Sequence, residues 1–215
     1  MCNMVAGPVV AVRGESFREV APERARFAVA VLARDRDREA TLSRLAERAA
    51  AVRVLLDGYD SMIERRETGE LRVSPELRRS GEKVRAYHGS VRTTVTVTDF
   101  TTLGELLLRL ADQDQVEVSG PWWSLRPDSP VYREARHAAI ADALRRAHEY
   151  AEALGARVTA LVELADAGVD RPATLAARSY SAAAERLPEL DLDPQPQSVQ
   201  AAVQARFTIS EPVLR

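Results

Sequence analysis

The sequence has little cysteine and almost no lysine. Cys2 is its one cysteine, so no intrachain disulfide can form. Lys83 is its one lysine, and the other cationic residues are all arginine. With 30 Lys and Arg against 32 Asp and Glu, the net charge is −2, which provides no strong field for a polyanion. The arginines at 34, 36 and 38 alternate with aspartates, a pattern typical of a solvated surface, so we expect no nucleic-acid partner.

Long apolar runs are also lacking. No stretch approaches the roughly 18 apolar residues that a membrane-spanning helix needs, so we expect no transmembrane segment. Residues 1–8 have neither the basic start nor the apolar stretch of a signal peptide. As the sequence stands, it predicts a cytoplasmic protein.

The glycine-rich motifs of nucleotide-binding proteins and the Gly-x-Ser-x-Gly motif of hydrolases do not occur. We therefore expect neither a cofactor nor an enzyme. The pair most suited to chemistry is Glu134 and His137, a Glu-x-x-His spacing that could supply two metal ligands. His148 lies about 16 Å further along the same predicted helix and cannot share a metal with His137. A metal-dependent hydrolase using Glu134 and His137 is one hypothesis, and a solvated helix edge is the simpler interpretation.

Hydrophobic periodicity predicts strands and helices in the order β-β-α-β-β-α-β-α-β-β. Strands are expected where apolar residues alternate, and helices where they recur every three or four residues. The predicted strands are 9–14, 22–33, 62–73, 84–98, 116–120, 158–164 and 199–209, and the predicted helices are 42–56, 102–110 and 132–155.

This order predicts an α+β fold, with two amphipathic helices and one long Ala-rich helix packed on a mixed or antiparallel sheet. Two β-α-β-like units, at roughly 22–73 and 84–125, indicate a degenerate internal repeat. Thr102 and Glu105 have the spacing of a capping box. Gly14, Gly58 and Gly155 are expected at chain reversals or helix ends, where glycine readily adopts positive φ.

Residues 165–197 are rich in Ala, Pro and Asp and have little periodicity. We interpret this segment as a loop insertion within a single domain of residues 1–215. One hypothesis follows from it: a ligand-binding groove between the long helix and the insertion.

The sequence resembles the SIMPL-domain (DUF541) family. The strongest match is the strand at 116–120 followed by a helix containing Glu134-Ala-Arg136 and regularly spaced alanines. Residues 10–15, 21–25 and 87–97 are similar to the strand segments of the family. The resemblance implies a SIMPL-like fold and a role in stress tolerance or at the cell envelope. It implies no established chemistry, and many relatives are exported.

Trp122 and Trp123 are adjacent on a predicted strand, so their side chains cannot both point into the core. We expect one of them to be exposed or to lie at an interface; the alternative is that the insertion covers it. The segment Trp122, Trp123 and Leu125 is therefore our candidate interface. The leading hypothesis is a non-enzymatic SIMPL-domain protein that acts through self-association, as a homo-oligomer, or through partner binding.

Overall fold

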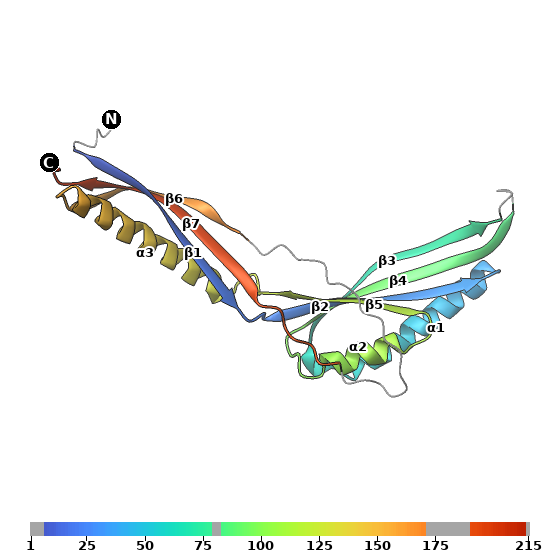
Figure 1. The fold of residues 1–215 in the computed structure, drawn as a ribbon. Coiled ribbons are helices and arrows are strands. Elements are labelled where there is room, and N and C mark those ends of the chain that lie inside the picture. Colours follow the sequence, from blue (N-terminus) through green and yellow to red (C-terminus); the bar gives the residue numbers. More distant parts are fainter. Residues whose placement is uncertain (1–6, 79–82, 171–189, 214–215) are drawn as a thin grey trace. The chain divides into compact units, whose positions relative to one another are not determined.

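The computed structural model describes residues 7–78, 83–170 and 190–213 (Figure 1). It has an α+β fold with the predicted order of strands and helices, arranged in two antiparallel sheets. The elements are β1 (Val9–Val20), β2 (Arg24–Asp35), α1 (Arg38–Asp57), the 3₁₀ turn η1 (Asp60–Met62), β3 (Ile63–Leu77), β4 (Val84–Val97), α2 (Leu103–Ala111), β5 (Val116–Ser124), α3 (Pro130–Ala153), β6 (Val158–Asp170) and β7 (Gln197–Ile209).

The chain divides into two compact units. The first unit comprises residues 1–21, 125–173 and 196–215, and the second comprises residues 22–124 and 174–195. Each unit has its own sheet and its own hydrophobic core.

The second unit runs β2-α1-β3-β4-α2-β5 along the chain, and its strands lie in the order β3-β4-β2-β5. Each neighbouring pair is antiparallel. Two β-α-β halves arranged in this way form the split topology of ferredoxin-like domains. Each half of the predicted repeat thus corresponds to one β-α-β half of this unit.

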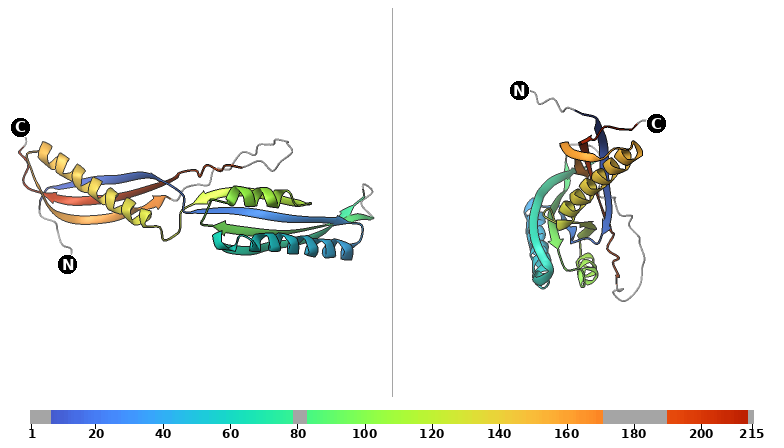
Figure 2. Two further views of the ribbon diagram at one scale, coloured as in Figure 1. Left: turned by 90° about the horizontal axis from the view of Figure 1, so that it is seen from below. Right: turned by 90° about the vertical axis from the view of Figure 1, so that its left-hand side faces the viewer.

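Both helices of the second unit lie on one face of its sheet (Figure 2). The core between these helices and the sheet contains apolar side chains of β2, β4, α1 and α2, among them Phe27 and Leu106, which are fully buried. On α1 the buried positions include Thr41, Leu45 and Leu56. Asp37 caps this helix by accepting a hydrogen bond from the backbone N–H of Ala40 at 2.8 Å.

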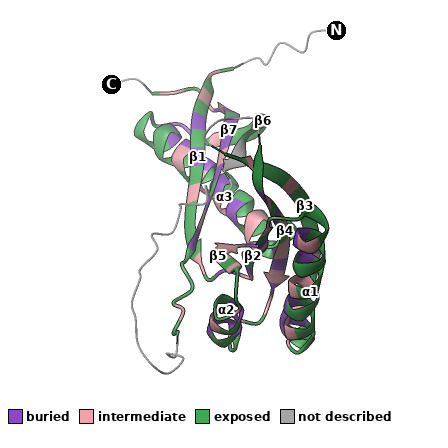
Figure 3. Ribbon diagram, turned by 90° about the vertical axis from the view of Figure 1, so that its right-hand side faces the viewer, coloured by how far each residue is buried: buried purple, intermediate pink, exposed green. Residues whose placement is uncertain are grey.

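The first unit has the strand order β1-β7-β6, with α3 packed on one face. Along β7, residues buried against α3 alternate with more exposed ones. The helix buries a single stripe of alanines, and much of its remaining surface is exposed (Figure 3). The stripe consists of Ala135, Ala139, Ala143, Ala147 and Ala151.

The alanine stripe allows α3 to approach β1 very closely at Gly14. A Cβ atom on Gly14 would lie far inside contact distance of the Ala139 carbonyl oxygen and of Ala143. Our expectation that Gly14 marks a chain reversal was wrong, because it lies within β1 and is needed for space. Gly155 does adopt positive φ, at 65°.

Several local predictions also need correction. Thr102 makes no side-chain capping bond, and Glu105 instead accepts from the Tyr59 hydroxyl at 3.0 Å, so the capping box was wrong. Gly58 ends α1 in a right-handed conformation, with φ of −65°, so its role as a left-handed cap was also wrong.

Strand lengths differ from the prediction as well. β3 extends through residues 74–77, where we expected a loop, and β5 continues to Ser124. β6 includes residues 165–170 of the predicted insertion, and residues 171–189 lie outside the described residues. Residues 190–196 precede β7, and Leu192 packs against the core of the second unit.

Candidate functional site

The candidate interface divides between the two sheet faces and the two units. Trp123 lies opposite Ala25 in the ladder, on the helix-covered face, and packs against the core of the second unit. Its ring meets Phe100 edge to face, with the centroids 4.9 Å apart. Leu125 is buried in the core of the first unit. Leu125 could contact another molecule only if that core repacked, whereas Trp123 is half-buried.

Trp122 has a different environment. It pairs with Arg26, which alternates along β2 with the fully buried Ala25 and Phe27. Trp122 therefore lies on the helix-free face of the sheet, because neighbouring side chains on a strand point to opposite faces. The Arg26 guanidinium lies 6.0 Å from the centroid of the Trp122 ring, near the outer limit of a cation–π contact. Both tryptophans are half-buried, and Trp122 is the one whose side chain lies on the helix-free face.

Glu134 and His137 lie on α3, whose buried stripe they do not join. Glu134 accepts a hydrogen bond from Nη1 of Arg18 on β1, at 2.6 Å. Within the described part of the chain, no three His, Cys, Asp or Glu side chains gather as metal ligands. The structure thus gives Glu134 a role in an ion pair between α3 and β1.

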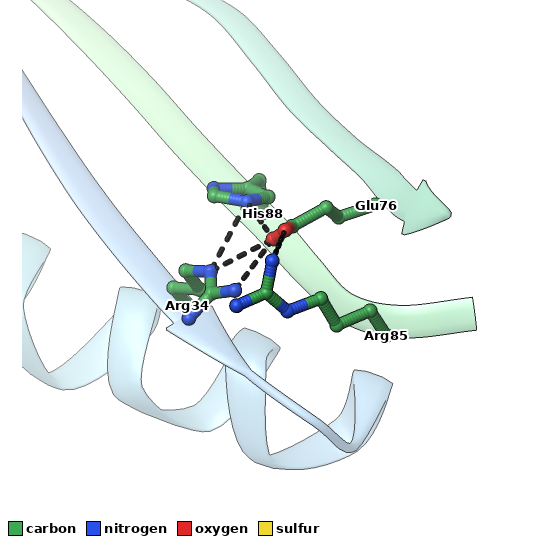
Figure 4. A network of polar contacts seen from close by, with 4 residues as sticks. All are labelled: Arg34, Glu76, Arg85 and His88. Atoms are coloured by element: carbon green, nitrogen blue, oxygen red, sulfur yellow. Dashed lines mark hydrogen bonds and ion pairs between the residues drawn. The ribbon is translucent and has the colours of Figure 1, made fainter. Parts of the chain in front are cut away.

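A polar cluster that the sequence analysis missed lies on the second unit, where β2, β3 and β4 run side by side (Figure 4). The Glu76 carboxylate accepts from Nε and Nη2 of Arg34, at 2.9 and 2.7 Å. Nε2 of His88 lies 2.8 Å from the same oxygen, and Nη1 of Arg85 lies 3.2 Å from the other. The hydrogen bond from Arg34, followed by that from His88, lowers the pKa of Glu76. Strand pairing brings these residues together from separate segments, so no local motif could have revealed them.

A cavity lies beside this cluster. It has a volume of about 890 Å³ and is lined by Arg34, Asp35, Arg36, Leu77, Arg78, Val84, Arg85 and Ala86. Asp35 accepts from the backbone N–H of Asp37 at 3.1 Å, which lowers the pKa of Asp35, and it also pairs with Arg44 at 3.0 Å. The lining is therefore predominantly cationic.

A second cavity of the same unit, about 840 Å³, lies between α2 and residues 190–192. Phe100, Leu108, Leu190 and Leu192 provide its apolar lining. Gly104 lies directly under the backbone of Leu190, where a Cβ atom would overlap the carbonyl oxygen. We predicted a groove between the long helix and the insertion, and nothing described tests it; the cavity found here lies between α2 and the part of the insertion at 190–192. The part of that prediction that concerns residues 171–189 lies outside the described residues.

The fold and these sites describe an α+β protein with two antiparallel sheets, one of ferredoxin-like topology and one covered by an alanine-faced helix. The family model of SIMPL, described as a protein of unknown function (DUF541), matches residues 10–207. The chain therefore belongs to the SIMPL family, as its sequence motifs indicated. A comparison with curated proteins found no match. None of the described helices is both long and apolar enough to cross a membrane.

Proposed function

We propose that this SIMPL-domain protein is a non-enzymatic binding protein that associates with a second copy of itself. The contact surface is the helix-free face of the four-stranded sheet β3-β4-β2-β5. The observation that carries the proposal is the position of Trp122, a large aromatic side chain on the face opposite the helices and core. Tryptophan and arginine are the residue types most enriched among those that dominate binding energy at interfaces. Trp122 and Arg26 place one of each side by side.

Two of the four edge strands, β5 and β1, are poor sites for adding another strand, which favours a contact through a sheet face. Pro121 lies within the edge strand β5 and lacks the N–H that a continued ladder needs. At the β1 edge of the other sheet, the Glu15 N–H donates to Asp142 at 3.0 Å. Blocked edges of this kind oppose the addition of another strand.

The lack of a catalytic role is part of the proposal. It is supported by the ion pair of Glu134 with Arg18, which occupies the carboxylate of the Glu-x-x-His pair. In keeping with the family resemblance, we also propose a role in stress tolerance or at the envelope.

The experiment is a measurement of molar mass in solution by light scattering, at low and high salt, for the wild type and for W122A. A discrete multiple of 23.7 kDa that persists at high salt is expected for the wild type, and a shift toward monomer for the variant. A monomeric wild-type protein at all concentrations would refute self-association.

A second candidate function is the binding of an apolar ligand in the cavity between α2 and residues 190–192, which the four apolar lining residues favour. A fluorescent apolar probe such as anilinonaphthalene sulfonate should bind the native protein there. The variant L108R should abolish that signal without lowering the melting temperature by more than a few degrees. Equal probe binding by both proteins would remove this candidate.

A further inference from the structure

The arginine-lined cavity of the second unit has more hydrogen-bond donors than its lining can satisfy. Four guanidiniums carry about twenty N–H donors, and they come from Arg34, Arg36, Arg78 and Arg85. Glu76 engages two donor nitrogens of Arg34 and one of Arg85. Its Oε2 oxygen already accepts from Arg34 and contacts His88, so it has little capacity left.

The second carboxylate at the cavity is also occupied. Asp35 accepts a hydrogen bond from the backbone N–H of Asp37 and forms an ion pair with Arg44. Arg36 and Arg78 are both exposed, and they lie on the cavity from two different segments of the chain. They therefore bring guanidinium donors to the cavity that neither carboxylate engages through a described hydrogen bond.

The local charge balance indicates the charge of a ligand. The four lining guanidiniums and that of Arg44, which pairs with Asp35, stand against the carboxylates of Asp35, Asp37 and Glu76, an excess of two positive charges. A phosphate monoester carries about −1.5 to −2 at neutral pH, which matches this excess. Arginine also matches phosphate in geometry, because its fork of N–H groups can bind two oxygens at once.

Helix α1 begins at Arg38, two residues after Arg36, but Asp37 caps its N-terminal end and Glu39 lies in its first turn. The positive charge at the cavity therefore comes from the arginines. The cavity volume of about 890 Å³ falls within the usual range of small-ligand sites, so it has room for a phosphate group and a small organic part.

From these observations we propose that the cavity lined by Arg34, Arg36, Arg78 and Arg85 binds the phosphate group of a small soluble ligand. Glu76 holds Arg34 and Arg85 in place. Arg36 and Arg78, which line the cavity from two different segments, donate hydrogen bonds to the phosphate oxygens. The site is separate from Trp122, and its function does not depend on self-association.

The test is calorimetric titration of the full chain with inorganic phosphate at slightly alkaline pH and constant ionic strength, with chloride as the reference anion. The double variant R36Q/R78Q should bind phosphate about a hundredfold more weakly, roughly tenfold for each charge-assisted hydrogen bond lost. The matched control is R53Q/R157Q, which removes the same charge from two exposed arginines that do not line the cavity. Its affinity should equal that of the wild type.

A second measurement does not depend on variants. In ¹⁵N spectra of the wild-type protein, phosphate should shift the arginine Nε signals of the cavity residues at lower concentration than those of Arg53 and Arg157. The proposal is overturned if phosphate binds no better than chloride, or if both double variants lose affinity equally. Binding of a single-stranded oligonucleotide but not of phosphate would overturn it as well, because the surface would then recognise a polyanion.

Discussion

The Asp142 carboxylate on α3 accepts a hydrogen bond from the backbone N–H of Glu15 on β1, with a distance of 3.0 Å between Oδ2 and nitrogen. β1 is an edge strand, so this N–H would otherwise project toward solvent as a site for strand addition. Asp142 is held by Arg146 at 2.9 Å and also pairs with Arg145. One side chain thus joins helix to sheet and closes part of the sheet edge.

Replacing Asp142 by Ala should lower the free energy of unfolding by about 1.5–3 kcal/mol, the usual contribution of a hydrogen bond to a charged group. The hydrogen bond from the Glu15 N–H lowers the pKa of Asp142. A lowered pKa contributes stability above the unfolded-state value near 3.9, and that stability is lost as pH falls through the folded-state pKa. Denaturant unfolding of wild type and D142A from pH 7 to pH 3 should therefore show a difference that shrinks below about pH 4. A difference that grows toward low pH would contradict this account.

Replacing Gly14 by Ala should be more damaging. The added methyl group would collide with the backbone of α3 at Ala139 and Ala143, and backbone atoms cannot move aside cheaply. We expect a loss of about 3 kcal/mol or more, at the upper end of overpacking costs. The control is G69A, where the nearest atom would lie at an ordinary contact distance of 3.5 Å. Thermal unfolding of the two variants should separate them clearly, and equal melting temperatures would show that α3 lies further from β1.

The alanine stripe of α3 gives a related prediction with a control on the same helix. Ala143 is 1% exposed, so A143L should cost about 1–3 kcal/mol through overpacking. Ala141 is exposed on the same helix, and A141L should change stability by less than about 0.5 kcal/mol. Urea denaturation measures both; similar losses in the two variants would indicate that this helix face is not packed on the sheet.

The Glu-x-x-His pair should not hold a metal. Purified wild-type protein and the variant H137A should have the same zinc content after incubation with zinc and dialysis. E134A should lose only the exposed ion pair to Arg18, about 0–1 kcal/mol. One equivalent of zinc bound by the wild type but not by H137A would contradict this prediction and support the hypothesis of a metal-dependent hydrolase.

The order of elements could be read from the sequence because local periodicity decides it. The alternation in 199–209 and the apolar spacing in α1 depend only on neighbouring residues. The division into two sheets could not be predicted from the sequence, because it depends on strand pairings between distant residues, such as Val12 with Ala205. The same limit explains why Arg34, Glu76 and His88 were missed.

Some residues were identified for the wrong reason. Gly14 was expected at a chain reversal because glycine readily adopts positive φ. It is required instead because α3 lies so close to it that no side chain fits. The expectation that the two tryptophans face opposite ways follows from strand geometry and is confirmed. Which of them faces the core depended on the register between β2 and β5, which pairs Trp123 with Ala25 and which the sequence pattern does not reveal.

The central claim, that Trp122 mediates self-association, is tested most directly by light scattering on wild type, W122A and the control W123A. Truncation of an interface tryptophan typically costs about 2 kcal/mol or more, so W122A should dissociate at roughly thirtyfold higher concentration than the wild type. W123A should melt at a lower temperature, because Trp123 packs on Phe100, yet keep the wild-type mass while folded. A W122A protein with the same mass as the wild type at every concentration would contradict the account.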